Sequence, residues 1–486
     1  MNKRYFIISM VYVVLLLLVG CSNKSKIFSL TILSINDLHG EIIQDESGKS
    51  GLSNMAYLVE EIRNENDLDD VILLGNGDMF QGSVISNVNQ GLVVLEAMNE
   101  MNFDGMGIGE DEFSLGLETI LNYFDEDPEN GEANFPLINS NIYHKGDESL
   151  LTIDGGKIFD SIVVEREGIE VGIISYLGHL SDGDDKFNDY NANLEIIQSI
   201  QTLGSNLKTN GVDIIVVNLH ESNNKLNQKI AEIKGNKGNY LVDALINGHS
   251  HRLEQSEIIR SKGVALPVIQ AGSKGQYLGK ITLNIDVNKH NVKDSKIELI
   301  HVDEADKNFD KEVEGIINRY NEKLGEVILI EAGETIESKY VLQKWITNVM
   351  IAATGADIAI YNNGGIRSTG HINEGDDVSI NTVNDIFPLE NIYIIESTYG
   401  EIKYFLDDPT LFGGVRRGYD KEDSNPCTVA INSHVYLKVK YGIGFSYDSG
   451  LIIRDIMIED LRLKGEKGER FMPTNHSKAD LGLQTH

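Results

Sequence analysis

Four short apolar segments of this chain, each with the composition of a buried strand, are followed by an aspartate or a histidine. Residues 30–35 precede Asp37 and His39, residues 71–74 precede Asp78, residues 212–219 precede His220, and residues 241–246 precede His249 and His251. Because ligands of open α/β sheets bind at the carboxyl ends of the strands, we expect these side chains to meet at one edge of one sheet. Carboxylate oxygens and imidazole nitrogens are ligands of small divalent cations. The pattern therefore predicts a metal site.

Each of these residues also has a commoner interpretation when it is considered alone. Asp37 and His39 flank Leu38, so on an extended strand end their side chains would point the same way, but the run also fits a capped turn. Asp78 follows a glycine, which fits an Asx-turn, and a lone histidine after a strand is more often structural than a ligand. Only the joint occurrence of these residues supports the metal prediction.

The chain has 486 residues, which is enough for two or three domains with cores of their own. Strand-like and helix-like segments alternate, which is typical of the α/β class. We expect a first α/β domain over residues 28–305, a long polar linker helix within residues 306–328, and a second, smaller α/β domain over residues 329–486. Expected helices lie at residues 53–64, 91–101, 225–233, 342–353 and 400–406. Further strands are expected at residues 171–175, 357–361 and 391–397, and a hairpin at 281–287 and 295–302.

The charge balance limits the partners of this protein. Lys and Arg number 42 against 75 acidic residues, which gives a formal net charge of −33. Such a surface excludes a general affinity for nucleic acid and gives no electrostatic help in binding an anionic membrane. An anionic substrate must therefore be attracted by a local positive centre, which a metal site would supply.

The first twenty-one residues have the features of an export signal. Lys3 and Arg4 precede an apolar run over residues 5–19, and the run ends at Gly20 and Cys21. This arrangement resembles a bacterial lipoprotein signal, which implies a lipid on Cys21, anchorage to a bacterial membrane and a place in the cell envelope outside the cytoplasm. The alternative is an uncleaved membrane helix, for which the apolar run is short. The other cysteine, Cys427, then has no disulfide partner, and a metal site built from cysteines is excluded.

Taken in order, the motifs resemble those of a known enzyme family. They are Asn36-Asp37-Leu38-His39-Gly40, Asn76-Gly77-Asp78 with Gln81-Gly82-Ser83, Leu219-His220 and Gly248-His249-Ser250-His251. This set is similar to the calcineurin-like metallophosphoesterases, and more narrowly to the two-domain bacterial surface 5'-nucleotidases. The likeness runs from about residue 28 to the 460s. Asn362-Asn363-Gly364-Gly365-Ile366-Arg367 is similar to the substrate-binding loop of that family.

The resemblance implies a fold, two metal ions and a reaction. The first domain would be a four-layer β-sandwich flanked by helices, and the second a smaller substrate-binding α/β domain. One ion would be held by Asp37, His39, Asp78 and His251, and the other by Asp78, His220, His249 and Glu110, with Asp78 bridging. Two such ions act as Lewis acids on a phosphoryl group and activate a water for attack, so the resemblance implies hydrolysis of a phosphate ester such as a nucleotide.

The catalytic motif departs from the family's pattern. The family's Gly-Asn-His-Glu-Phe-Asp stands here as Gly109-Glu110-Asp111-Glu112-Phe113-Ser114. Asp111 occupies the position of the catalytic histidine, and Ser114 that of the aspartate that orients it. Losing such an acid–base group typically costs on the order of 10²–10⁴ in rate. We therefore expect metal binding with weak turnover. The alternatives are a degenerate lipoprotein that binds metal and ligand without turnover, and a lipoprotein whose fold serves a protein partner.

The substrate side is also changed. The resemblance assigns substrate binding to Asn363, Gly364, Gly365, Arg367 and Asn391. The guanidinium of Arg367 suits a phosphate or a carboxylate, although a surface turn with a solvated arginine has the same sequence. Leu389 stands where the family has one ring of an aromatic pair that holds a purine, and the segment that carries the second ring is not recognisable around Phe471. We therefore expect poor purine stacking and a C-terminal domain that is truncated relative to the family.

Overall fold

The structure is a computed structural model that describes residues 26–43, 51–65, 70–146, 149–153, 155–178, 189–235, 238–367, 372–387, 390–439 and 446–473. The predicted export signal with Cys21, and Leu389, lie outside these ranges. By its internal contacts the chain divides into two compact units. The first is made of residues 1–39, 52–81 and 94–310, and the second of residues 40–51, 82–93 and 311–486. No helix within the described ranges combines the length and the apolar character needed to cross a membrane.

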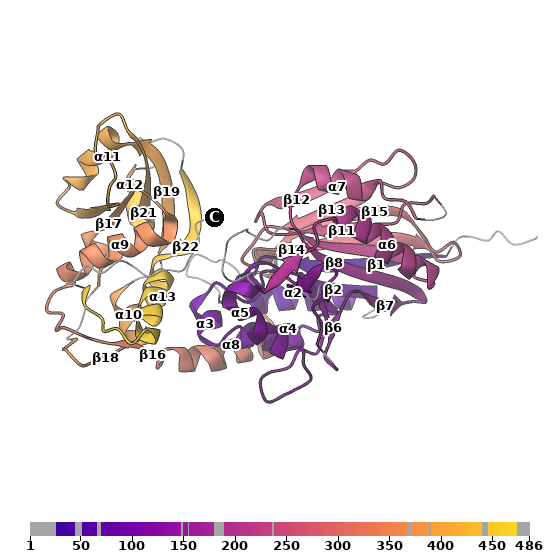
Figure 1. Ribbon diagram of the computed structural model, residues 1–486, viewed down its shortest axis with the longest axis horizontal. Helices are drawn as coiled ribbons and strands as arrows, with labels where there is room; N and C mark the ends of the chain where they lie inside the picture. The colour runs from indigo at the N-terminus through magenta and orange to yellow at the C-terminus, as the bar shows by residue number, and fades with distance from the viewer. Residues whose placement is uncertain are drawn as a thin grey trace, which may run out of the picture. The chain divides into compact units, whose positions relative to one another are not determined.

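The first unit contains two mixed β-sheets (Figure 1). The strands of the larger sheet are β1 (Ile27–Ile35), β2 (Val71–Asn76), β3 (Gly105–Gly107), β4 (Leu137–Ile138), β6 (Ile158–Phe159), β14 (Tyr277–Asp286) and β15 (Asn291–His301). Those of the smaller sheet are β7 (Ile162–Arg166), β8 (Ile169–Leu177), β10 (Ile214–His220), β11 (Ala244–Asn247), β12 (Leu253–Ile258) and β13 (Leu266–Ala271). The larger sheet has the order β15-β14-β1-β2-β3-β4-β6, and the smaller has the order β12-β13-β11-β10-β8-β7. A further short pair joins β5 (Ile142–His144) to β9 (Tyr190–Ala192).

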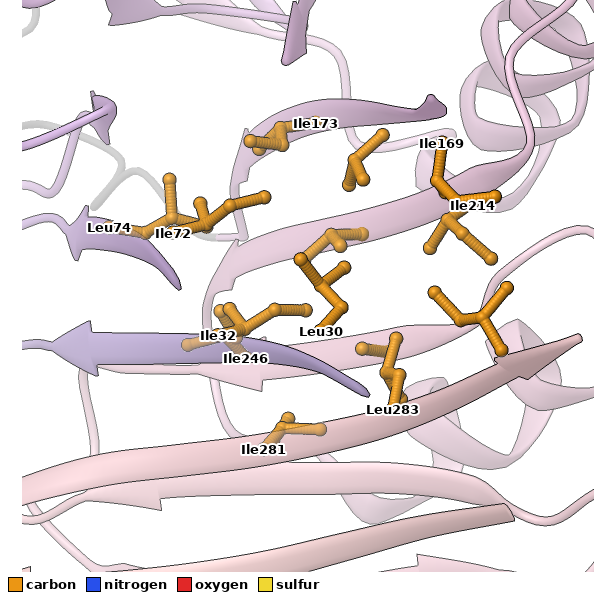
Figure 2. Close-up of a cluster of buried hydrophobic side chains, with 14 of the residues drawn as sticks. Leu30, Ile32, Ile72, Leu74, Ile169, Ile173, Ile214, Ile246, Ile281 and Leu283 are labelled. Carbon is orange, nitrogen blue, oxygen red and sulfur yellow. The ribbon is translucent and has the colours of Figure 1, made fainter. Parts of the chain in front are cut away.

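The two sheets pack face to face around an apolar core. Leu30, Ile32, Ile72 and Leu74 of the larger sheet contact Ile173, Ile214 and Ile246 of the smaller one, and Figure 2 shows these side chains pointing into the shared layer. Each fully buried side chain of this size contributes about 1.5–3 kcal/mol through the hydrophobic effect. This layer accounts for every second apolar residue along these strands.

Strand β10 shows how the sequence alternates between two buried layers. Ile214 and Val216 belong to the core between the sheets, whereas Ile215 and Val217 belong to a second apolar cluster. That second cluster contains side chains of α6 (Ile196–Thr209) and α7 (Asn224–Ala231), which lie beside the smaller sheet in Figure 1. The other helices of this unit are α2 (Leu52–Glu65), α4 (Leu92–Glu100, which begins in the second unit) and α5 (Asp111–Asn122), with the 3-10 turn η3 (Val302–Ala305). The predicted α/β class with a sandwich flanked by helices is confirmed.

The prediction that the candidate ligands meet at one edge of one sheet is wrong. Asp37 and Asp78 follow β1 and β2 of the larger sheet, whereas His220 ends β10 and His249 follows β11 of the smaller sheet. The physical link is a set of amide hydrogen bonds between the two sheets. The Asn76 side chain donates to the carbonyls of Leu219 (3.3 Å) and Ile246 (3.2 Å). The Asn218 side chain donates to the carbonyl of Gly75 (2.9 Å). The carboxyl end of β2 in the larger sheet therefore lies next to the carboxyl ends of β10 and β11 in the smaller sheet.

The second unit is built around a five-stranded sheet of order β20-β17-β21-β19-β22. Its strands are β17 (Ile358–Asn362), β19 (Asn391–Thr398), β20 (Leu411–Val415), β21 (Pro426–Asn432) and β22 (Ser446–Ile452), and a separate pair joins β16 (Ile328–Glu331) to β18 (Asp377–Ser379). Its helices are α3 (Val84–Val88), α8 (Lys311–Leu324), α9 (Leu342–Thr354), α10 (Ile380–Ile386), α11 (Tyr399–Leu406), α12 (Ser433–Val439) and α13 (Ile453–Glu466). The 3-10 turns η4 (Lys339–Val341) and η5 (Asn363–Gly365) complete it.

A buried charged group lies in the core of the second unit. Asp460 on α13 is fully buried, and its Oδ2 accepts hydrogen bonds from the indole of Trp345 (2.6 Å) and the ammonium of Lys464 (2.7 Å). Trp345 also packs edge-on against Phe471, with ring centroids 4.8 Å apart. Phe471, in the polar segment that follows α13, thus lies in the core of the second unit.

We expect the substitution Asp460→Ala to lower the free energy of unfolding by about 3–5 kcal/mol, because it leaves the buried charge of Lys464 unpaired. Urea unfolding followed by circular dichroism measures this change. Glu466→Ala on the same helix is the control, since Glu466 pairs with Arg462 at the surface and should contribute about 0–1 kcal/mol. Equal effects of the two substitutions would contradict the assignment of Asp460 as a buried ionic anchor.

Candidate metal centre

The loops that follow β1 and β2 are tied together by backbone hydrogen bonds. The Asp37 N–H donates to the Gly77 carbonyl (3.1 Å), and the His39 N–H donates to the Asp78 carbonyl (2.9 Å). Gly77 has a φ of +76°, and a Cβ there would lie 2.6 Å from Nδ1 of His220, so this position requires glycine. These contacts bring Asp37, His39 and Asp78 to the end of β10.

Five of the predicted ligands have left-handed backbone conformations. Their φ angles are +50° at Asp37, +51° at His39, +52° at Asp78, +69° at His249 and +55° at His251. Positive φ is uncommon outside glycine, and residues held in this way cluster at functional sites. The prediction that Asp37 and His39 lie on an extended strand end is wrong, because β1 ends at Ile35 and the loop that follows carries both residues in left-handed conformations. Their side chains converge nevertheless.

One group of four potential ligands is formed by Asp78, Glu110, His220 and His249, whose nearest donor atoms all lie within 4.8 Å of one another. Nε2 of His220 lies 3.1 Å from Oδ2 of Asp78 and 2.9 Å from Oε2 of Glu110. Nδ1 of His249 contacts Oε1 of Glu110. This is the set that the resemblance assigns to the second ion.

A second group contains Asp37, His39 and His251. The Nε2 atoms of the two histidines lie 2.9 Å apart, and Nε2 of His251 lies 3.6 Å from Oδ1 of Asp37. The Asp37 carboxylate is buried and is held by the Asn36 side chain (2.5 Å) and by the His249 N–H (2.9 Å). Asp78, which the resemblance places in both sets, groups with His39 and Asp111 rather than with Asp37.

Asp111 contacts the site through His39. Its Oδ2 lies 3.2 Å from Nδ1 of His39, and its Oδ1 accepts a hydrogen bond from the Ser114 hydroxyl (3.1 Å). Its backbone N–H donates to Oδ1 of Asp78 (2.8 Å). When one ring nitrogen of a histidine binds a metal, a carboxylate at the other nitrogen fixes the ring and raises its basicity. Asp111 is placed to orient His39 in this way.

The carboxylates and histidines perturb one another strongly. Burial, together with the neighbouring Asp78, raises the pKa of Asp37 to about 6. Burial opposes protonation of His39, but Asp111 and Asp78 outweigh it and raise the pKa of His39 to about 9. Burial also opposes ionisation of Glu110, yet His220 and His249 hold its pKa well below the usual value. The buried carboxylates thus favour a positive charge beside them. A protonated histidine supplies that charge, and a bound cation would supply it as well.

The donor set fits a divalent cation. The Nδ1 of His220 is occupied by the Asn76 carbonyl (2.7 Å), so that Nε2 faces the cluster. Nε2 is buried and makes no hydrogen bond of acceptable geometry to any described residue, although two carboxylates lie near it. A buried nitrogen of this kind, aimed at carboxylates and histidines, matches the preference of zinc or manganese for imidazole and carboxylate ligands.

Glu112 belongs to the site but was not among the predicted residues. It is fully buried on α5, and its carboxylate accepts hydrogen bonds from the backbone N–H groups of Asp78 (2.9 Å), Met79 (2.8 Å) and Gly109 (2.7 Å). Burial and the nearby Asp78 raise its pKa to about 7. Glu112 therefore joins the loop after β2 to the loop that carries Glu110.

We expect Glu112→Gln to reduce the affinity for Mn²⁺ or Zn²⁺ by about 10-fold to 100-fold, as is usual for groups that position metal ligands. An amide offers only one acceptor oxygen for three N–H donors, so the two loops lose their common anchor. Isothermal titration calorimetry on chelator-stripped protein measures the change. Glu118→Gln is the matched control, because Glu118 lies on the same helix and accepts a hydrogen bond from the Tyr190 hydroxyl (2.8 Å) rather than from the loops of the site. An unchanged affinity in Glu112→Gln would refute the anchoring role.

The predicted substrate loop lines a pocket in the second unit. This pocket has a volume of about 430 Å³ and is lined by Asn362, Gly364, Gly365, Arg367, Glu390, Thr410 and His434. Its described lining does not include Asn363 or Asn391. Asn363 accepts a hydrogen bond from Gln343 (2.7 Å) and donates to the Pro409 carbonyl (2.9 Å), and the Asn391 backbone contacts Ser433. Their sequence neighbours Asn362 and Glu390 line the pocket instead.

Comparison with known proteins agrees with this arrangement. Residues 326–449 match the family model described as 5'-nucleotidase, C-terminal domain. The snake venom 5'-nucleotidase of Crotalus adamanteus is 29% identical over 334 residues, which cover 64% of this chain and 54% of that protein. The trifunctional nucleotide phosphoesterase protein YfkN of Bacillus subtilis is 26% identical over 425 residues, which cover 79% of this chain and 28% of that protein. The chain thus spans about half the length, or less, of these relatives.

Solved structures show the same fold at low sequence identity. The NAD nucleotidase NadN of Haemophilus influenzae superposes with a TM-score of 0.60 at 17% identity, over 92% of this chain and 97% of that one. The 5'-nucleotidase precursor of Thermus thermophilus gives a TM-score of 0.54 at 19% identity, over 90% and 96% of the two chains. The resemblance predicted from the motifs is confirmed.

Proposed function

We propose that this chain, which is similar to 5'-nucleotidases, is a phosphoesterase that uses two divalent metal ions and hydrolyses a phosphate ester such as a nucleotide at a reduced rate. The observation that carries this proposal is the convergence of Asp78, Glu110, His220 and His249 beside Asp37, His39 and His251. No other described part of the chain gathers so many buried nitrogen and carboxylate donors.

Bound divalent ions would supply Lewis acidity and a more acidic water for attack on the phosphoryl group. The protein side chains would hold them in fixed positions. His220 presents Nε2 because the Asn76 carbonyl occupies Nδ1, and the Asp37 carboxylate is fixed by the His249 N–H. Asp78 has Oδ2 near Nε2 of His220, and its Oδ1 accepts a hydrogen bond from the Asp111 N–H.

The reduced rate follows from Asp111. As a carboxylate it carries a negative charge and, unless protonated, cannot donate a hydrogen bond to a phosphoryl oxygen. It faces His39, where it supports a metal ligand instead of stabilising the transition state. The chemistry of the site therefore favours ion binding over proton donation.

The location of the protein is part of the proposal. We infer that a lipid on Cys21 anchors it to a bacterial membrane, with both units outside the cytoplasm. The support is the sequence of the first twenty-one residues. The substitution Cys21→Ala would then release the protein from the membrane fraction and abolish its labelling by a radiolabelled fatty acid.

A second candidate is a catalytically degenerate lipoprotein that binds metal and ligand without turnover. The same contact between Asp111 and His39 favours it, since a carboxylate that orients a metal ligand supports ion binding without turnover.

The experiment that separates the two candidates combines metal analysis with a phosphatase screen. Purified protein loaded with Mn²⁺ or Zn²⁺ is assayed with nucleoside monophosphates and p-nitrophenyl phosphate. Two ions per chain with slow, metal-dependent phosphate release supports the phosphoesterase. Two ions without release supports the degenerate protein, and failure to bind metal overturns both.

A further inference from the structure

The pocket of the second unit contains an anionic and a cationic side chain that do not pair with each other. Arg367 and Glu390 both line it. Among the described residues, the only hydrogen bond of Arg367 is made by its backbone N–H, to the Ile386 carbonyl (2.9 Å), and its guanidinium forms no ion pair. Glu390 likewise has no ion pair within the described part of the chain. Charged groups in a pocket are usually paired, so these two charges are available to a ligand.

The Glu390 carboxylate is held in place by one of its oxygens. Oε2 accepts hydrogen bonds from the Tyr361 hydroxyl (3.0 Å) and from the Asn432 side chain (2.9 Å). Asn432 is fully buried and also donates to Oδ1 of Asn362 (2.6 Å), so its position is fixed. Oε1 accepts no hydrogen bond from any described residue. The carboxylate is therefore rigid and has one acceptor oxygen to spare.

The second glycine of the loop, Gly365, is needed for this arrangement. A Cβ at Gly365 would lie 2.5 Å from the Tyr361 hydroxyl, so a larger residue would displace the group that holds Glu390. The turn η5 thus leaves space for Tyr361 as well as for a ligand.

We propose that Glu390 determines the specificity of this pocket, an inference that rests on the proposed role of the pocket in binding the substrate. A carboxylate only accepts hydrogen bonds, and a guanidinium only donates them. The matching ligand therefore presents a hydrogen-bond donor, either a hydroxyl or an ammonium, beside an acceptor for Arg367. A ligand without the donor leaves Glu390 desolvated and unpaired, and one with a second anionic group is repelled.

Binding of nucleoside analogues to the full chain tests this proposal. The probes are adenosine, 3'-amino-3'-deoxyadenosine and 2',3'-dideoxyadenosine, titrated calorimetrically in the presence of a chelator. We expect wild type to bind the dideoxy compound at least about 10-fold more weakly than adenosine, the usual effect of losing a hydrogen bond to a charged group. Tighter binding of the amino analogue than of adenosine would identify an ammonium as the preferred donor, and weaker binding would identify a hydroxyl.

The variant Glu390→Gln keeps the shape of the side chain and removes its charge. It should reduce the preference for adenosine over the dideoxy compound to less than about threefold. Glu396→Gln, an exposed position on β19 that does not line the pocket, is the matched control and should behave as wild type. Equal affinity of wild type for all three probes, no binding of any probe by folded protein, or an unchanged preference in Glu390→Gln would overturn the proposal.

Hydrolysis of p-nitrophenyl phosphate by the metal-loaded protein reports the proposed function separately. That ester has neither a hydroxyl nor an amine on its leaving group, so its turnover by wild type tests the phosphoesterase without a hydrogen bond to Glu390. The control Glu396→Gln, outside the pocket, should leave this turnover within about twofold of wild type. Turnover without selective nucleoside binding would refute only the role of Glu390, and selective binding without turnover would refute only the phosphoesterase.

Discussion

Replacing Glu110 with asparagine and Asp111 with histidine is expected to raise the turnover of a phosphate ester by about 100-fold, the lower end of the usual contribution of a general acid. The exchange removes two negative charges beside the phosphoryl position and supplies a side chain that can donate a proton. The measurement is the initial rate of phosphate release by Mn²⁺-loaded protein, with the metal content of each sample determined in parallel.

The control for this prediction separates charge from proton donation. Asp111→Asn removes the charge but provides no acid, so we expect it to gain no more than about 10-fold through weaker repulsion. Adding Ser114→Asp to the double variant restores a carboxylate that can orient the new histidine and should increase the rate further. A double variant that binds two ions and stays as slow as wild type would show that Asp111 does not limit turnover.

Removing His220 is expected to abolish binding of one of the two proposed ions, with a loss of affinity at that site of at least about 100-fold, the upper end of the usual effect of disturbing a metal site. His220 is 1% exposed and supplies the one fully buried imidazole of its group, so no neighbouring donor can take its place. The measurement is metal stoichiometry by mass spectrometry after dialysis, together with thermal unfolding with and without a chelator. Ligand binding to the folded state stabilises it, so the rise in melting temperature on adding metal should shrink.

Two further variants make the His220→Ala result interpretable. His220→Asn retains a donor for the Asn76 carbonyl, so a loss of metal in this variant cannot be attributed to a lost structural hydrogen bond. His290→Ala is the matched control, because His290 is a half-exposed histidine that pairs with Asp213 (2.9 Å) away from the cluster. Two bound ions in both His220 variants would exclude His220 as a ligand.

The sequence allowed much of the fold to be predicted, and local patterns explain why. The apolar runs before Asp78 and His220 form β2 and β10, and the helices expected near residues 53–64 and 342–353 are α2 and α9. The resemblance implied a sandwich of two sheets, but the local patterns could not show which parallel strands belong to which sheet. That division depends on long-range contacts such as the hydrogen bonds from Asn76 to the Leu219 and Ile246 carbonyls, which no local pattern indicates.

The sequence predicted the candidate metal ligands, but it did not predict the residues that hold those ligands in place. Glu112 lies at the start of α5, where an acidic residue is usually explained by helix capping or by the helix dipole, so its three backbone hydrogen bonds were not expected. In the second unit the sequence indicated Asn363 and Asn391, whereas their neighbours Asn362 and Glu390 line the pocket. A shift of one residue reverses the side on which a strand residue lies, and strand ends are where such shifts are hardest to predict.

The left-handed backbone at Asp37, His39, Asp78, His249 and His251 has a consequence for the lifetime of the protein. Conformations of this kind cost on the order of 1–3 kcal/mol each and persist only where the surroundings over-determine them. A bound ion would be part of those surroundings, so starvation for metal should loosen the loops that follow β1, β2 and β11 before either sheet opens. Proteases would then cut these loops first, so scarcity of the metal would lead to faster degradation of the protein.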